Sequence, residues 1–222
     1  VLAMMRFVLR PTVIQSSFAW TLIAAFLALN GGHPASTVYL ATGGLVLVIS
    51  LIETSHRMAF SDELTGLPSR RALTDALMRL PEMYTVAMID IDHFKKLNDE
   101  HGHAAGDQVL RLIGSTLTRT EGGGRPFRYG GEEFAVLFPQ TDLEGAHELA
   151  ERLRRALAAR PMATHPGGLV AVTASFGVAA FPDAPTPAAL FASADEALYR
   201  AKHAGKNCVV SADAGTIVRA HE

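Results

Sequence analysis

This sequence has almost no cysteine, little net charge and one long segment without any charged residue. Cys208 is the single cysteine among 222 residues, which excludes an intrachain disulfide framework and a metal site built from several thiolates. The formal net charge is only −2, so the chain has no basic excess of the kind that binds nucleic-acid polymers. Apolar residues make up 49% of the chain and charged residues 19%, a balance that excludes an intrinsically disordered chain.

Charge is absent altogether from Pro11 to Ile52, a run of 42 residues. Within it, Thr12–Leu29 and Thr37–Ile52 are mostly apolar, and the turn-forming segment Asn30–Ser36 separates them. Each apolar half approaches the ~20 residues with which a helix crosses a bilayer. Because helices of soluble proteins normally keep a charged face, the run predicts two membrane-spanning helices. The alternatives are a buried helical hairpin and a secretory signal peptide, and the second apolar half argues against the latter.

Basic residues give this anchor an orientation. Arg6 and Arg10 precede the first apolar half, and Arg57 follows the second. Since basic residues concentrate on the cytoplasmic side, both ends are expected there and the Asn30–Ser36 turn outside. We therefore expect a membrane anchor with its stalk in residues 1–57, the helical stalk running on over Glu53–Phe60, and a globular domain in residues 58–222.

Beyond the stalk, hydrophobic periodicity predicts strands that alternate with helices, a pattern typical of an α/β sheet covered by helices. The expected strands are Tyr84–Ile91, Arg125–Tyr129, Phe134–Phe138, Leu169–Phe181 and Cys208–Ser211, with a hairpin turn at Gly130–Gly131. The expected helices lie within Asp62–Leu80, over Ala105–Leu117, from a Thr141–Glu144 capping box to Leu157, and from Pro187, capped by Thr186, to about His203.

Two acidic clusters are the candidate chemistry. Asp90 and Asp92 stand at the end of an expected strand, on the same side because strand side chains alternate. Glu132 and Glu133 follow the glycine pair at the hairpin tip. Carboxylates from a strand end and a facing hairpin can converge on Mg²⁺ and complete its shell with substrate phosphates. Each cluster alone is also typical of solvated acids and an ordinary turn.

The motifs together resemble the GGDEF-domain diguanylate cyclases over about Ser61 to Val210. The matching segments are Asp62-Glu63-Leu64-Thr65-Gly66-Leu67, Asp90-Ile91-Asp92-His93-Phe94-Lys95, Asn98-Asp99, Gly102-His103, Gly106-Asp107, the signature Arg128-Tyr129-Gly130-Gly131-Glu132-Glu133-Phe134 in its GGEEF form, Ala197-Leu198-Tyr199, Ala201-Lys202 and Gly205-Lys206-Asn207. The resemblance implies an α/β (α+β) fold with a central, mostly antiparallel sheet flanked by helices. This fold is similar to the palm of nucleotide polymerases and to class III nucleotidyl cyclases.

The same resemblance implies an enzyme that joins two GTP molecules into cyclic di-GMP and releases two pyrophosphates. Together with the two predicted spans and their basic flanks, it implies a bacterial inner-membrane protein whose catalytic domain lies in the cytoplasm. The catalytic domain is expected to work as a homodimer, because each subunit would hold one GTP. A catalytically silent GTP-binding or interaction module is the alternative, and a cyclase of another nucleotide chemistry is a third. The expected partners are GTP, the membrane and a second copy of the chain, and no nucleic-acid polymer.

By resemblance, Asp90, Glu132 and Glu133 are the expected catalytic residues. Asp90, the Ile91 carbonyl, Glu132 and Glu133 would bind two Mg²⁺ ions per site, with Mn²⁺ as a substitute. Glu132 would also help to deprotonate the 3′-hydroxyl. Two-metal catalysis uses one ion to activate the attacking oxygen and the other to stabilise the leaving group.

Substrate contacts follow from the resemblance in the same way. Backbone amides around Phe94, with the ammonium groups of Lys95, Lys202 and Lys206, would hold the β- and γ-phosphates. Asn98 and Asp107 would read guanine through hydrogen bonds, and His103 would line or orient that pocket. Lys206 replaces the family's usual arginine and loses its two-pronged donor geometry.

The chain departs from the family at the site of product inhibition. There the family has an Arg-x-x-Asp pattern, and this chain has Glu121 and Gly124 at the corresponding positions. We therefore expect no primary inhibitory site for cyclic di-GMP. Ser69 also replaces the usual asparagine of the opening motif.

Overall fold

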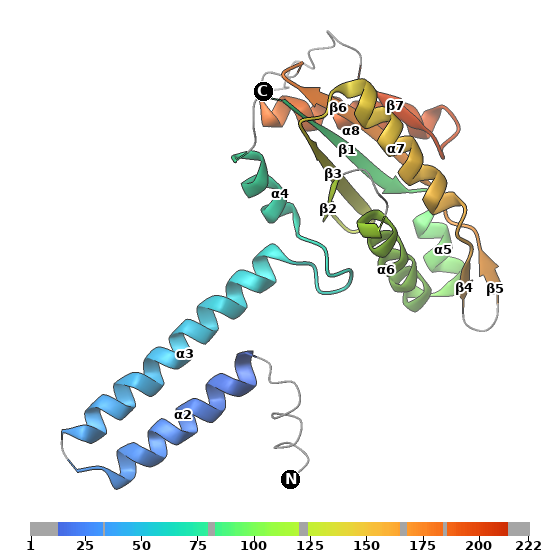
Figure 1. The fold of residues 1–222 in the computed structure, drawn as a ribbon. Helices are drawn as coiled ribbons and strands as arrows, with labels where there is room; N and C mark the ends of the chain where they lie inside the picture. The colour runs from blue at the N-terminus through green and yellow to red at the C-terminus, as the bar shows by residue number, and fades with distance from the viewer. Residues whose placement is uncertain are drawn as a thin grey trace, which may run out of the picture. The chain divides into compact units, whose positions relative to one another are not determined.

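The computed structural model describes residues 13–32, 34–79, 83–119, 124–164, 168–183 and 186–212 (Figure 1). The chain divides into two compact units, Val1–Ala59 and Phe60–Glu222. Glu121, which stands at one of the two positions where the family's inhibitory-site pattern is missing, lies outside the described residues. Arg6 and Arg10, on which the expected orientation of the anchor depends, lie outside them too.

The N-terminal unit is a pair of apolar helices, α2 (Val13–Asn30) and α3 (Ala35–Phe60). They approach each other through small side chains, because a Cβ added at Gly43 would lie 3.2 Å from the Cβ of Ala24. Most of the large apolar side chains whose surroundings are described, including Trp20 and Phe26, stay exposed. Over the described residues, the helix pair therefore buries small side chains and exposes most of its bulky apolar ones.

Only α3 is long and apolar enough to cross a membrane, judged over the described residues, and the apolar helix Ser16–Asn30 is shorter than such a span. Just 11% of the apolar window of α3 is buried inside the chain, unlike the core helix of a soluble protein. The predicted helical stalk is confirmed, since α3 continues without a break through Glu53–Phe60.

The second unit is built on a five-stranded sheet of strand order β2-β3-β1-β6-β7. Its central strand β1 (Tyr84–Ile91) pairs antiparallel with β3 (Glu133–Pro139) and β6 (Ala174–Phe181). At the two edges, β2 (Arg125–Arg128) is antiparallel to β3, and β7 (Val209–Ser211) is parallel to β6. The predicted α/β class, with a mostly antiparallel sheet flanked by helices, is confirmed.

Helices cover both faces of this sheet (Figure 1). One core cluster joins it to α5 (Phe94–His101), α6 (His103–Arg119) and α7 (Leu143–Ala158), and the other joins it to α4 (Arg70–Leu77) and α8 (Pro187–His203). Strand alternation sends Ile89 to the first cluster and Met88 to the second. The same alternation directs Asp90 towards the face covered by α8.

The α8 helix lies unusually close to the sheet at Gly177. A Cβ at this position would lie 2.1 Å from the carbonyl oxygen of Ala194 and 2.2 Å from the amide nitrogen of Leu198. Both are backbone atoms that cannot swing away, so only glycine fits here. This contact fixes the height of α8 above β6, and α8 carries Lys202.

Three expectations from the sequence need correction. The apolar run Leu169–Phe181 is not one strand, because β5 (Gly168–Val170) pairs with β4 (Met162–Thr164) in a separate two-stranded sheet before β6 begins. The cap of α7 lies one residue later than predicted, since Asp142 is the N-cap and its side chain accepts from the Gly145 amide at 2.9 Å. Helix α5 is not among the predicted helices, because it has eight residues and buries only Phe94 and Leu97.

Candidate active site

The end of β1 brings two carboxylates face to face. Asp90 and Glu133 are direct partners in the β1–β3 register, and strand alternation puts both on the α8 face of the sheet. Like charges placed directly opposite each other on neighbouring strands are destabilising. The pair therefore needs positive charge nearby.

Lys202 supplies part of that charge. Its Nζ lies 2.7 Å from Asp90 Oδ2, and the Asp90 side chain is only 10% exposed. The other carboxylate oxygen, Asp90 Oδ1, is buried and has no hydrogen-bond partner. A buried acceptor without a donor is costly, so this oxygen is available to a ligand that brings positive charge or a donor.

Glu132 belongs to the same electrostatic cluster. Burial raises the pKa of its carboxyl, the charges of Asp90 and Glu133 raise it further, and Lys202 opposes them. Three carboxylates and one ammonium leave two uncompensated negative charges when all are ionised. That excess is the charge of one divalent cation.

The acidic residues at the end of β1 offer oxygen ligands for a hard divalent metal, but they do not form a complete metal site by themselves. Among the residues that the structure describes, no three histidine, cysteine or acidic side chains are gathered into a ready metal site. Mg²⁺ is however usually held by one or two carboxylates together with substrate phosphates rather than by a complete protein cage. The unpartnered Asp90 Oδ1 and the excess negative charge fit that mode of binding, with Glu132 and Glu133 as the further oxygen donors.

Asp92 has a different role from Asp90, although both are buried acids at the end of one strand. Its carboxylate accepts hydrogen bonds from Thr173 Oγ1 and Ser175 Oγ, each at 2.7 Å, and from the Asn207 amide at 3.0 Å. With both oxygens engaged, Asp92 joins β6 and the segment before β7 to the end of β1. It supports the site and is poorly placed to bind a ligand itself.

The start of α5 lies next to this cluster and has the form of an anion site. His93 precedes the helix with a φ of 59° and makes no side-chain cap, and the first amides of any helix lack partners within it. Lys95 is exposed, and Lys206 Nζ lies 3.4 Å from His93 Nε2. The Phe94 side chain packs into the core, so this residue could contact a phosphate only through its backbone amide.

Asn98 and Asp107 lie on α5 and α6, the helix pair that follows β1. Asn98 Oδ1 is buried and lacks a hydrogen-bond partner. A Cβ at Gly106 would lie 2.0 Å from this oxygen, so the glycine makes room for the amide. Asn98 Oδ1 is therefore a second buried acceptor, besides Asp90 Oδ1, that has no donor. His103, at the start of α6, is exposed.

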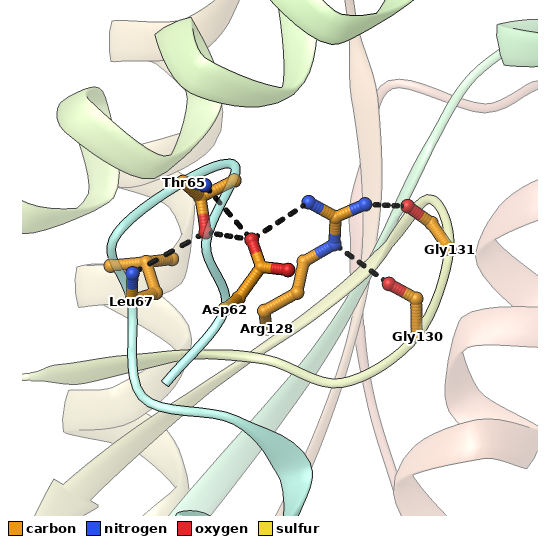
Figure 2. A network of polar contacts seen from close by, with 6 residues as sticks. All are labelled: Asp62, Thr65, Leu67, Arg128, Gly130 and Gly131. Atoms are coloured by element: carbon orange, nitrogen blue, oxygen red, sulfur yellow. Dashed lines mark hydrogen bonds and ion pairs between the residues drawn. The ribbon is translucent and has the colours of Figure 1, made fainter. Parts of the chain in front are cut away.

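Arg128 connects this region to the chain that enters the domain, a role that the sequence motifs do not predict (Figure 2). It donates to the carbonyl of Gly130 at 2.7 Å and to that of Gly131, and it pairs with Asp62 Oδ1 at 3.3 Å. Asp62 in turn accepts from the amide and hydroxyl of Thr65. An arginine two residues before a glycine turn was the available signal, because turn carbonyls need donors.

The Arg128 guanidinium also interacts electrostatically with α6. Burial lowers the pKa of Arg128, and the carboxylates of Asp62 and Asp107 oppose that shift. One cation therefore lies within electrostatic reach of the entry turn, the glycine hairpin and α6. Removing it would leave two hairpin carbonyls without this donor and Asp62 without its ion pair.

Together, the buried carboxylates, the neighbouring helix N-terminus and the lysines define a domain suited to a metal-bound nucleotide. The family described as diguanylate cyclase, GGDEF domain, matches residues 59–208. The chain belongs to this family.

Curated relatives agree with this assignment. The chain is 43% identical over 166 residues to diguanylate cyclase DgcP of Pseudomonas aeruginosa, covering 71% of this chain and 25% of that protein. It is 41% identical over 169 residues to the response regulator PleD of Caulobacter vibrioides, covering 72% of this chain and 37% of that protein. The chain thus spans between a quarter and two fifths of the length of these two relatives.

Solved structures share the fold. The coiled coil and GGDEF domain of DgcB from Caulobacter crescentus, in complex with c-di-GMP, is similar with a TM-score of 0.72 and 31% identity, covering 80% of this chain and 98% of that one. An active GGEEF domain of a diguanylate cyclase from Vibrio cholerae gives a TM-score of 0.54 at 29% identity, covering 65% of this chain and 90% of that one.

Proposed function

We propose that the chain is a diguanylate cyclase that condenses two GTP molecules into cyclic di-GMP and two pyrophosphates. The observation that supports this most directly is the charge arrangement at the end of β1. An unpartnered Asp90 oxygen and an excess of carboxylate lie beside a helix start and lysines suited to phosphates. Family membership supplies GTP as the substrate class.

In this proposal, Asn98 Oδ1 and the Asp107 carboxylate accept from the N1–H and N2–H of guanine. Adenine offers no such pair, so the two acceptors would stay unsatisfied with ATP. The α5 amides, Lys95, Lys202 and Lys206 hold the β- and γ-phosphates. Lys202 must then share its charge between Asp90 and the triphosphate.

For each new bond, the 3′-hydroxyl oxygen of one GTP attacks the α-phosphorus of the other, and the bond from that phosphorus to pyrophosphate breaks. Glu132 accepts the hydroxyl proton, because a carboxylate is suited to both proton acceptance and metal ligation. Asp90, the Ile91 carbonyl, Glu132 and Glu133 would hold two Mg²⁺ ions. When bound, the ions lower the pKa of the hydroxyl and stabilise the leaving pyrophosphate.

The ring closes only if two half-sites meet, so we also propose that the active form is a homodimer. The α3 stalk enters the catalytic domain through the Asp62 turn, which Arg128 ties to the glycine hairpin. Pairing two chains through α3 would raise the effective concentration of one half-site at the other. A catalytically silent GTP-binding module is the alternative, and an assay of product formation separates the two.

The enzymatic test compares the wild type with Glu132→Gln in the full chain, using GTP and Mg²⁺ and analysis of the nucleotides formed. Loss of a general base that also binds metal should slow product formation by at least ~100-fold. Glu144→Gln, an exposed glutamate in the first turn of α7, is the matched control and should keep wild-type activity. A dimeric wild type that makes no cyclic dinucleotide would refute the enzyme proposal in favour of a silent module.

Guanine selection depends on Gly106 in this proposal. The methyl group of Gly106→Ala would displace the Asn98 amide, because the two atoms would lie 2.0 Å apart. Without one of its two base contacts, the enzyme should show a KM for GTP raised roughly ten-fold and a reduced preference for GTP over ATP. Gly114→Ala, on the same helix but beside Thr65 and Leu67, is the control. Unchanged base selectivity in Gly106→Ala would contradict the assignment of Asn98.

We propose that the primary inhibitory site for cyclic di-GMP is missing. A Cβ at Gly124 would lie 2.6 Å from Val136 Cγ1 and 2.7 Å from Phe138 Cε1, so the family's aspartate does not fit without rearrangement. Calorimetric titration of GTP-free protein with cyclic di-GMP should detect no tight, stoichiometric binding. Tight binding that is abolished by changes within Glu121–Arg125 would overturn this proposal.

We propose that α2 and α3 cross the bacterial inner membrane as a two-span anchor, with the catalytic domain in the cytoplasm. The exposed bulky apolar surface of both helices and the basic residues outside them support this. A reporter enzyme fused within the Asn30–Ser36 turn should be active only on the external side. Cytoplasmic activity of that fusion would disprove the two-span topology.

A further inference from the structure

The loop that carries Lys206 is held in an unfavourable backbone conformation. Gly205, Lys206 and Asn207 have φ values of 116°, 64° and 46°. Asparagine tolerates positive φ, but a lysine adopts it uncommonly and needs support from its surroundings, and such strain is typical of functional segments. The contacts that enforce it therefore decide where the Lys206 ammonium lies.

Two hydrogen bonds on Asn207 hold the loop. Its backbone amide donates to Asp92 Oδ2 at 3.0 Å, and its side-chain Oδ1 accepts from Arg154 Nη1 at 2.8 Å. Asp92 is itself fixed by Thr173 and Ser175. One bond thus fastens the loop to the end of β1, and the other fastens it to α7 on the outside of the sheet.

Arg154 is well placed to act as a rigid support. Its side chain is only 15% exposed, and Nε and Nη2 both donate to the carboxylate of Glu151, one turn earlier on α7. The hydrogen bond with Glu151 raises the pKa of Arg154, so its charge is secure. With two donors committed to Glu151, the remaining amino group is aimed at Asn207.

We propose that Arg154 is a positioning residue for the substrate triphosphate, acting through Asn207 on Lys206. This inference deepens the proposed function and rests on it, because the anion is taken to be the β- and γ-phosphates of GTP. Lys206 stands where the family usually has arginine, and an ammonium cannot fix its own orientation with a two-pronged donor. The Glu151–Arg154–Asn207 chain, together with His93 beside Lys206 Nζ, provides that orientation from outside.

The neighbouring residue Arg155 offers a matched control. It is on the same helix and also faces Glu151, at 3.6 Å, but its side chain is 73% exposed. Arg154→Met and Arg155→Met remove the same charge from the same turn. Only the first breaks the bond to Asn207.

The test measures binding of 3′-deoxy-GTP and of GMP to the full chain with Mg²⁺ by calorimetry. The deoxy analogue lacks the attacking hydroxyl, so binding is read without turnover. Arg154→Met should weaken 3′-deoxy-GTP roughly three- to ten-fold and leave GMP unchanged, because the hydrogen bond that it removes serves the outer phosphates. Arg155→Met should change neither. A variant that weakens both ligands equally would show a general structural role and overturn the inference.

A double-mutant cycle with Lys206→Ala checks the route. If Arg154 acts through Lys206, the double variant should bind 3′-deoxy-GTP about as weakly as the weaker single variant, and additive losses would contradict the mechanism. Asn207→Gly keeps the left-handed backbone and the backbone amide but removes the side-chain carboxamide, so it should reproduce the binding defect of Arg154→Met. Arg154→Lys should recover part of the binding that Arg154→Met loses. The melting temperature of each variant is measured alongside, and a binding defect limited to variants that melt early would also overturn the proposal.

The two hypotheses fail in different ways. A wild type that binds 3′-deoxy-GTP no better than GMP lacks the triphosphate site, and both proposals fall. A wild type that prefers the triphosphate, with a preference that Arg154→Met retains, refutes the role of Arg154 alone. The cyclase proposal would stand in that case.

Discussion

Repulsion among the carboxylates at the end of β1 is the constraint around which this domain is arranged. The sheet register sets Asp90 opposite Glu133, and the hairpin adds Glu132. Lys202 offsets one of these charges because α8 packs against Gly177 without the width of a side chain between them. The remaining excess favours a bound cation, and it also favours a bound proton at Glu132, whose pKa it raises. The feature that destabilises the free domain is therefore the one that would favour a metal-bound triphosphate.

Two polar networks keep the neighbouring loops close to that charge. Arg128 holds the glycine hairpin and the Asp62 turn on one side, and Asp92 with Arg154 holds the Lys206 loop on the other. Apart from Arg154, these side chains fall within the family motifs, but their contacts are with backbone atoms and with one another. A half-buried charged group with all its partners in place is costly to disturb. The geometry of the site therefore depends on residues outside it.

The sequence predicts the parts of the fold that are encoded locally. Alternation and turn residues identify β1, the β2–β3 hairpin and α8 with its Thr186 cap, and all are confirmed. The prediction of one strand over Leu169–Phe181 is wrong because a short strand followed by a long one has the same apolar composition, and only pairing with β4 or β1 distinguishes them. The separate roles of Asp90 and Asp92 are equally hidden, since they depend on Thr173, Ser175 and Lys202, which come from distant parts of the chain. The ligand and catalytic roles of the motif residues remain predictions.

The proposed membrane anchor and homodimer have a physical reason in the same electrostatics. A half-site with excess carboxylate that binds a polyanionic nucleotide should repel an identical loaded half-site, so free domains would meet rarely and separate quickly. Confining two copies to one membrane, with stalks that enter through the turn tied to the hairpin, raises their effective concentration without any new contact at the site. Divalent cations and the lysines reduce the repulsion that remains. In that proposal, the long uncharged run at the N-terminus would supply the encounter between half-sites that the crowded acids at the end of β1 would oppose.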